Sequence, residues 1–139
     1  MVEAVSSLYA NAPVDCGGGE FLNGCARLRV RGGVRTLLRA IHAAEHAAGR
    51  RGSGHDPRRL DIDVLYYDNR HVAQTGLQVP HPRRFERPFV VVPLAEVCGD
   101  AIDPDTGRPI RDELAFRLAG AQAGVRKALG PEWFEGVTR

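Results

Sequence analysis

The sequence of 139 residues predicts an α+β fold in a single domain, residues 1–139. Two observations predict this class. Apolar and polar residues alternate along residues 59–67, as they do in a strand, and apolar side chains recur with the period of a helix along residues 34–48. Because 43% of the residues are hydrophobic, a chain of this length can bury a core of its own.

The first predicted element is a strand pair within residues 2–30. Residues 2–9 and 21–30 are rich in side chains typical of strands, and the run Gly17-Gly18-Gly19 lies in the connection between them. Glycine runs can bind phosphate groups, but no Lys follows this one as it does in a phosphate-binding loop. The connection is therefore interpreted as a plain hairpin loop.

A helix is expected over residues 34–48, directly after two glycines. Its apolar side chains gather around Ile41, which predicts the buried face, and Glu45 lies in the middle of that face. A carboxylate at such a position is costly unless it has partners. Glu45 is therefore expected either to accept a buried hydrogen bond or to belong to a site at the end of the helix.

The same helix contains the pattern His-x-x-Glu-His from His42 to His46, which occurs in one class of zinc proteases. Both histidines lie on the flank of the predicted helix, and a zinc site would need a third ligand from elsewhere in the chain. We therefore interpret the two histidines as surface residues.

Residues 59–67 are predicted to form a strand that binds metal ions. Asp61 and Asp63 lie two residues apart and hence on one face of a strand, where two carboxylates can hold one hard cation or a pair of them. The alternative is that the two acids pair with the arginines directly before them. Residues 50–58, which are basic and rich in glycine, are expected to form a mobile loop within reach of any anion bound there.

Further along the chain, His81 lies between Pro80 and Pro82. Proline restricts the backbone on both sides, so His81 is suited to donate a hydrogen bond to a phosphate group, and a structural histidine is the alternative. Residues 89–94 are predicted to be a buried strand that Pro93 interrupts.

The C-terminal part is predicted to begin with a tight turn at residues 103–107. A helix is expected over residues 111–129, because apolar side chains recur along it with helical period and Gly130-Pro131 would end it. Trp133 and Phe134 are expected to pack onto the core as a tail.

Composition disfavours several classes of protein. The chain has no apolar run long enough to span a membrane and no pattern of a signal peptide, so a cytoplasmic protein is expected. A net charge of +2 is too small to indicate nucleic-acid binding. Cys16, Cys25 and Cys98 are odd in number and show no Cys-x-x-Cys spacing, which argues against a disulfide framework and against a zinc site built from them.

Taken together, these motifs resemble the 6-hydroxymethyl-7,8-dihydropterin pyrophosphokinases of folate biosynthesis. The resemblance rests on four motifs, Arg58-x-Leu60-Asp61-x-Asp63, Val79-Pro80-His81, Arg87-Pro88-Phe89 and Pro93-Leu94. It implies a ferredoxin-like βαββαβ sandwich. It also implies an enzyme that transfers pyrophosphate from ATP to the hydroxymethyl group of 6-hydroxymethyl-7,8-dihydropterin and releases AMP, without a nucleic-acid or membrane partner.

The resemblance also implies roles for individual residues. Asp61 and Asp63 would hold two Mg²⁺ ions that bridge the phosphates of ATP. The expected ATP-binding residues are Arg51, Arg58, His81 and Arg87, and the expected catalytic residues are Arg50, Arg58, Asp61 and Asp63. The pterin would be bound by Phe21, Asn23, Glu45 and Phe89, with the two aromatic rings on either side of the flat substrate.

The chain departs from the family pattern in three places. It has His55 where the family has a tryptophan, and Gly76 where the family has a basic residue. The family also begins with a strand and a helix that have no counterpart before Met1, so an N-terminally truncated sandwich with unpaired strand edges is expected. Three explanations are open: a start codon placed too far downstream, a decayed or repurposed homologue, and strand exchange in a dimer. The alternative function is a catalytically impaired or repurposed homologue that binds a nucleotide or a protein.

Overall fold

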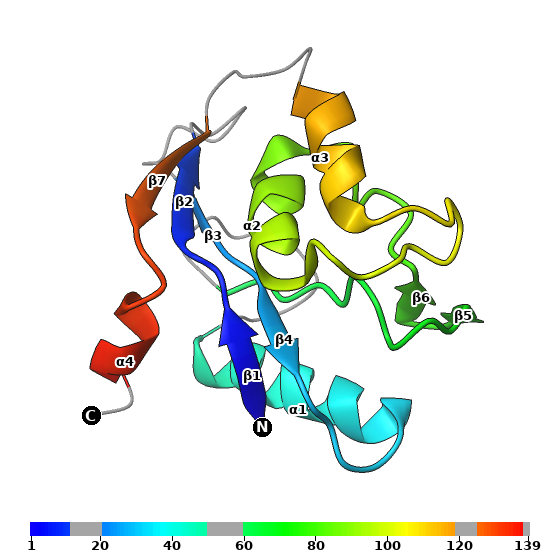
Figure 1. Ribbon diagram of the computed structural model, residues 1–139. Helices are drawn as coiled ribbons and strands as arrows, with labels where there is room; N and C mark the ends of the chain where they lie inside the picture. Colours follow the sequence, from blue (N-terminus) through cyan, green and yellow to red (C-terminus); the bar gives the residue numbers. More distant parts are fainter. Residues whose placement is uncertain (12–20, 50–59, 119–124, 138–139) are drawn as a thin grey trace. The chain divides into compact units, whose positions relative to one another are not determined.

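The computed structural model describes residues 1–11, 21–49, 60–118 and 125–137, and it contains both strands and helices, as expected for an α+β protein (Figure 1). The described residues fall into two compact units. The first consists of Met1 and residues 29–63, and the second of residues 2–28 and 64–139. The loop expected at residues 50–58 lies outside the described residues.

The first unit contains helix α1 (Val34–Ala47), which corresponds to the helix expected over residues 34–48. Gly32 precedes it with a φ of +92°, a backbone conformation that residues with a side chain rarely adopt. Leu37 is buried, Ile41 is half-buried and His42 is exposed. The buried face of the helix is therefore centred where the periodicity predicted it.

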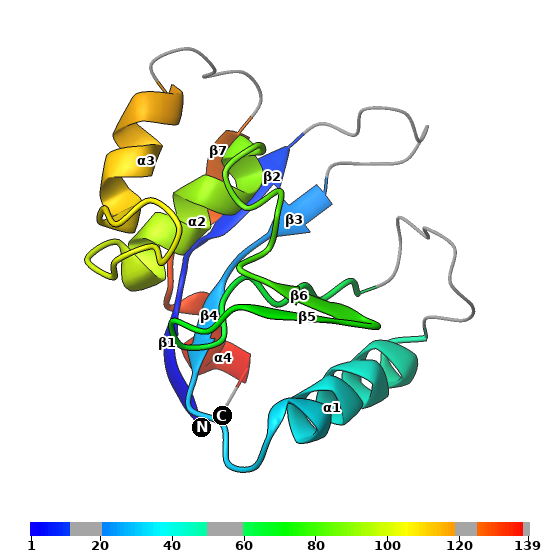
Figure 2. The same cartoon turned by 90° about the vertical axis from the view of Figure 1, so that its right-hand side faces the viewer.

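The strands belong to the second unit, and the described strands form three small antiparallel sheets. β1 (Val2–Val5) pairs with β4 (Ala26–Leu28), and β5 (Val72–Gln74) pairs with β6 (Leu77–Val79), as Figure 2 shows. β2 (Leu8–Asn11) lies between β3 (Phe21–Asn23) and β7 (Val125–Leu129). The strand pair expected within residues 2–30 is thus present as two shorter pairs.

A serine corner interrupts the first predicted strand between β1 and β2. Ser6 Oγ accepts a hydrogen bond from the backbone N–H of Cys25 at 2.8 Å, and Ser7 donates from both its backbone N–H and its hydroxyl to Glu96. Glu96 also accepts from the hydroxyl of Tyr9 at 2.7 Å. Side-chain hydrogen bonds therefore add to the backbone bond from the N–H of Ser6 to the carbonyl of Cys25, at 2.8 Å, where the strand is interrupted.

The environment of this corner shifts two pKa values. Burial and the hydrogen bond to Glu96 raise the pKa of Tyr9 to about 12. For Glu96, burial acts to raise the pKa, but the hydrogen bonds from Tyr9 and Ser7 outweigh it and lower the pKa. The indole N–H of Trp133, in α4 (Trp133–Val137), donates to the carbonyl of Ser6 at 2.8 Å, so the C-terminal tail packs against the same corner.

The strand predicted over residues 89–94 is wrong, because these residues belong to helix α2 (Pro88–Cys98). Pro88 occupies the first turn, where a missing N–H costs nothing. Val91, Leu94 and Val97 are buried at helical spacing, and Pro93 lies inside the helix. A short run that is apolar on all sides suits a buried strand and a buried helix equally well, so periodicity could not distinguish them.

The helix predicted over residues 111–129 is also wrong in its second half. Helix α3 (Ile110–Leu118) is shorter, and residues 125–129 form β7, which pairs antiparallel with β2 (Figure 1). The open edge of β2 offers hydrogen-bond partners to these residues, and a local pattern does not reveal such a distant partner. The turn expected at residues 103–107 is present.

The metal-binding strand predicted over residues 59–67 is not a strand, since residues 60–66 form no strand ladder with any part of the chain that the structure describes. The expected alternation persists, because Asp61 and Asp63 are exposed whereas Ile62 and Val64 are half-buried. A ladder needs a second chain segment, and local alternation alone does not supply one. Residue 59 lies outside the described residues.

The core of the second unit is formed by side chains from α2, α3 and the segment before α2. Phe85, Val91, Leu94 and Ile110 make up the buried cluster. Cys25 and Cys98 are free and half-buried and pack against it, and burial raises the pKa of Cys25 to about 12. Among the described helices, none combines the length and the apolar character that crossing a membrane requires.

Candidate active site

In the first unit, Glu45 of α1 is bound to the segment that carries the two aspartates. Its Oε1 accepts a hydrogen bond from the backbone N–H of Ile62 at 2.9 Å. Ile62 lies between Asp61 and Asp63, and Glu45 is half-buried. The unexpected acid on the buried helix face therefore has a partner, and this partner is the centre of the Asp-x-Asp motif.

The carboxylates of Asp61 and Asp63 fit a magnesium site that is completed by other ligands. Both are exposed, both supply the oxygen atoms that Mg²⁺ prefers, and their alternation with Ile62 and Val64 directs them to the same side of the extended segment. In the described ranges no three His, Cys, Asp or Glu side chains gather as a metal-binding cluster. Two carboxylates suffice for Mg²⁺, which usually takes its remaining ligands from phosphates and water.

The two histidines of α1 are exposed, as the surface interpretation requires. Glu45, the acid of the His-x-x-Glu-His pattern, accepts a hydrogen bond from the backbone N–H of Ile62. Within the described part of the chain, no third side chain joins the histidines as a metal ligand. The pattern therefore has a structural explanation in this helix.

In the second unit, His81 is fixed by its backbone and by one ring nitrogen. Its N–H donates to the carbonyl of Leu65 at 2.8 Å. Its Nδ1 accepts from the backbone N–H of Arg83 at 3.1 Å. Because Nδ1 acts as the acceptor, the neutral ring carries its proton on Nε2. Nε2 is therefore a hydrogen-bond donor of defined direction, as a phosphate contact requires.

Arg87 and Phe89 lie together at the beginning of α2. The guanidinium of Arg87 is 5.4 Å from the centroid of the Phe89 ring, and both side chains are half-buried. Arg87 Nε is buried and makes no hydrogen bond with any described residue. A buried guanidinium N–H without a partner is costly, and an anion at this position would satisfy it.

The remaining predicted residues are only partly described. Asn23 ends β3, is half-buried and pairs in register with Tyr9 of β2. Phe21 begins β3, and its side chain lies outside what the structure describes, as do Arg50, Arg51 and Arg58 altogether. Glu45, Asp61 and Asp63 belong to the first unit, and Asn23, His81, Arg87 and Phe89 belong to the second.

Arg84, which binds the carbonyl of His81, belongs to an ion-pair network that no sequence pattern revealed. Arg84 and Asp103 form a salt bridge at 2.8 Å, with side chains that are 8% and 0% exposed. Tyr66 donates to Asp103 Oδ2, and burial together with this contact raises the pKa of Tyr66. Burial would raise the pKa of Asp103, but the hydrogen bonds from Arg84 and Tyr66 hold it below its usual range. The partners lie 19 residues apart, so no local motif indicates them.

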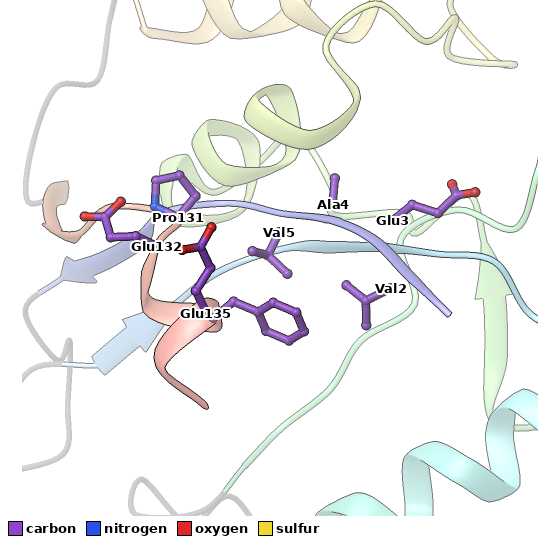
Figure 3. A pocket seen from close by; sticks show the side chains of 8 residues that line it. Val2, Glu3, Ala4, Val5, Pro131, Glu132 and Glu135 are labelled. Atoms are coloured by element: carbon purple, nitrogen blue, oxygen red, sulfur yellow. The ribbon is translucent and has the colours of Figure 1, made fainter. Parts of the chain in front are cut away.

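Two pockets of about 430 Å³ each lie in the second unit. The first, between β1 and α4, contains none of the predicted site residues and is lined by three carboxylates and several apolar side chains, Val2, Glu3, Ala4, Val5, Pro131, Glu132, Phe134 and Glu135 (Figure 3). Its acidic lining would repel a nucleotide phosphate. The second is lined by β5, β6 and residues that flank His81, including Pro80, Pro82 and Arg84.

Comparisons with known proteins agree with these motifs. Residues 1–99 match the model of the 7,8-dihydro-6-hydroxymethylpterin-pyrophosphokinase family. A 2-amino-4-hydroxy-6-hydroxymethyldihydropteridine pyrophosphokinase from Synechocystis is 40% identical over 110 residues, which cover 78% of this chain and 56% of that protein. The enzyme of the same name from Bacillus subtilis is 32% identical over 126 residues, covering 89% of this chain and 75% of that protein.

A mitochondrial folate synthesis bifunctional protein from pea is 41% identical over 103 residues, which cover 73% of this chain and 20% of that protein. The chain thus spans little more than half of the cyanobacterial relative and a fifth of the pea protein. The family match extends over the serine corner, α1, the Asp-x-Asp segment, His81 and α2. The chain belongs to the 7,8-dihydro-6-hydroxymethylpterin-pyrophosphokinase family.

Proposed function

We propose that the protein transfers a pyrophosphoryl group from ATP to 6-hydroxymethyl-7,8-dihydropterin in folate biosynthesis. The hydroxymethyl oxygen forms a bond to the β-phosphorus of ATP. The bond between the β-phosphorus and the oxygen that bridges to the α-phosphorus breaks, AMP leaves, and the hydroxyl proton is released to water. Family membership supports this reaction, and the arrangement at the start of α2 supports it independently.

The observation that carries the proposal is the contact between Arg87 and Phe89. The reaction transfers phosphate to the hydroxymethyl substituent of a flat ring system. The enzyme must therefore bring an anion site next to a surface that binds the ring. The 5.4 Å contact holds a guanidinium beside an aromatic ring, and the buried Nε of Arg87 has no hydrogen-bond partner among the described residues. Phe89 would stack on the pterin, and Arg87 would bind the phosphate being transferred.

His81 would act as a second phosphate donor. Its ring is oriented by the N–H of Arg83, so that Nε2–H is directed by the protein before any substrate binds. A donor fixed in advance loses little entropy when the phosphate arrives and stabilises charge that develops during transfer. Arg50, Arg51 and Arg58, which lie outside the described residues, are proposed to complete the cationic surroundings of ATP.

Two Mg²⁺ ions would be held by Asp61 and Asp63, where they would neutralise phosphate charge and align the reacting groups. The role of the protein at this place is to keep both carboxylates on one side of the segment. Glu45 contributes by binding the N–H of Ile62 between them. We assign Glu45 to this orientation, and its contact with the pterin stays a prediction, as do those of Phe21 and Asn23.

The finer expectations about the fold and the assembly are part of the same proposal. We propose a ferredoxin-like sandwich as the fold, a cytoplasmic location, and a dimer formed through unpaired strand edges. Size-exclusion chromatography with light scattering tests the dimer, for which a mass of twice 15.2 kDa is expected.

The central experiment is to incubate the chain with Mg²⁺, ATP and 6-hydroxymethyl-7,8-dihydropterin and to measure AMP. AMP that forms only when the pterin is present supports the proposed reaction. The rival function is a repurposed homologue that binds a nucleotide or a protein. Binding of Mg²⁺-ATP without any AMP would favour that rival and contradict the proposed transfer.

A further inference from the structure

The loop that carries His81 and Arg87 rests on a buried ion pair. Arg84 donates to Asp103 through Nε at 2.8 Å and through a terminal nitrogen at 3.1 Å, so that the two planar groups bind side by side. Both side chains are almost fully buried. The guanidinium also lies 4.6 Å from the centroid of the Phe85 ring in the core. Arg84 is therefore held in one position and one orientation.

The other polar contacts of the pair anchor neighbouring segments. Asp103 Oδ1 accepts the backbone N–H groups of Asp105 and Thr106 at 2.8 Å and 3.0 Å, which fixes the turn. The other terminal nitrogen of the Arg84 guanidinium donates to the carbonyl of His81 at 3.0 Å. A backbone that carries a proposed phosphate donor is thus bound directly by a buried cation.

His81 is consequently held at every polar group that faces the protein. Its N–H is bound by Leu65, its carbonyl by Arg84, and its Nδ1 by the N–H of Arg83. Only Nε2–H is left to meet a ligand. We propose that Arg84 and Asp103 are a positioning pair, which orients His81 so that its Nε2–H donates to a phosphate of the bound nucleotide. This inference rests on the proposed function, which makes His81 a nucleotide-binding residue.

If the pair of Arg84 and Asp103 only stabilised the fold, neutralising both residues would leave the affinity for nucleotide unchanged. Buried ion pairs add little net stability, because the cost of removing two charges from water offsets their attraction, and neutral replacements of similar size are often tolerated. The double variant Arg84→Met, Asp103→Asn removes both charges and keeps an acceptor for the N–H groups of Asp105 and Thr106. It deletes the side-chain bond to the His81 carbonyl and keeps the bond from the backbone N–H of residue 84, at 3.2 Å. Affinity for nucleotide therefore separates positioning from stability.

The test measures binding of α,β-methylene-ATP with Mg²⁺ by isothermal titration calorimetry, with urea unfolding as the check on folding. The double variant is expected to bind about ten-fold more weakly, the loss expected when one hydrogen bond to a charged group is misdirected. His81→Ala should show a similar loss, and the triple variant should lose no more than either. Arg84→Lys, which keeps the charge but lacks the fork, should weaken binding in the same way and serves if the double variant does not fold.

The matched control is Arg108→Met, Glu113→Gln, because the side chains of these residues form another ion pair with a buried carboxylate, at 2.8 Å. Its affinity should equal that of the unchanged protein. Unchanged affinity in the double variant would overturn the positioning role while the proposed function stands. Losses that add in the triple variant would also overturn it. If the unchanged protein binds no nucleotide, the proposed function fails, and the positioning role fails with it.

Discussion

The Asp61–Asp63 segment and the loop from His81 to Arg87 supply opposite charges, and they are supported in different ways. The aspartates are exposed on a segment that pairs with no described strand, and the described contact at its centre is one hydrogen bond from Ile62 to Glu45. The loop rests on the buried pair of Arg84 and Asp103.

The difference follows from what each group must do. A hydrogen-bond donor is effective only over a narrow range of angles, so the proposed phosphate contact of His81 requires a rigid support. Carboxylates that bind Mg²⁺ repel each other until the cation is present, and water and phosphates fill the remaining positions around the ion. Under the proposed function, the Asp61–Asp63 segment can therefore be completed by its ligands, whereas the loop that carries His81 must be ordered before the nucleotide binds.

The largest effect is expected from Asp63→Ala, which removes one of the two carboxylates that are proposed to hold Mg²⁺. Turnover should fall by about 10³-fold, as when a main electrostatic contact of a transition state is lost. AMP formation at saturating Mg²⁺-ATP measures it. Asp100→Ala is the control, since Asp100 is an exposed acid in the other unit that pairs with Arg111. A near-normal rate for Asp63→Ala would refute the metal assignment.

Asp103→Asn should lower the free energy of unfolding by about 2 kcal/mol, because it removes the buried charged partner of Arg84 and leaves it only the more exposed Asp105. The pKa of Asp103 lies below its unfolded value of 3.8, so its contribution to stability is present above that pH and is lost as the pH falls toward the folded pKa. Urea unfolding between pH 7 and pH 2 should show a shallower acid dependence for the variant. An equally steep dependence in both proteins would contradict this linkage.

Glu45→Ala should raise the Mg²⁺ concentration needed for half-maximal activity by about ten-fold, because the Asp-x-Asp segment loses the bond at its centre. Glu45→Gln keeps an oxygen that accepts from Ile62 and should behave much like the unchanged protein. His42→Ala, an exposed change on the same helix, is the control. If Glu45→Gln raised the required Mg²⁺ concentration as much as Glu45→Ala, the effect would come from the charge of Glu45 and not from its hydrogen bond.

The smallest effect is expected from Phe89→Leu, which preserves apolar bulk but removes the ring next to Arg87. A lost aromatic contact of about 1 kcal/mol corresponds to roughly a five-fold increase in KM for the pterin. KM for ATP should change less. A larger change for ATP than for the pterin would place Phe89 on the nucleotide side of the site.

Local patterns identified the parts of the molecule that depend on neighbours in the chain. The period of residues 34–48 predicted α1, and the alternation along residues 61–64 agrees with the exposure of Asp61 and Asp63 between half-buried neighbours, although the strand predicted there did not form. The unusual position of Glu45 correctly indicated a hidden partner. These features depend on a repeat of two or 3.6 residues, which is visible in the order of the residues alone.

Tertiary structure decided the features that depend on distant partners. Residues 89–94 became a helix within a core that surrounds them, and residues 125–129 became a strand because β2 offered an edge. The identity of the Glu45 partner and the pairing of Arg84 with Asp103 also required the folded chain. Hydrogen-bond ladders and buried ion pairs join segments that are far apart in sequence, so their stability depends on the fold and not on any local pattern.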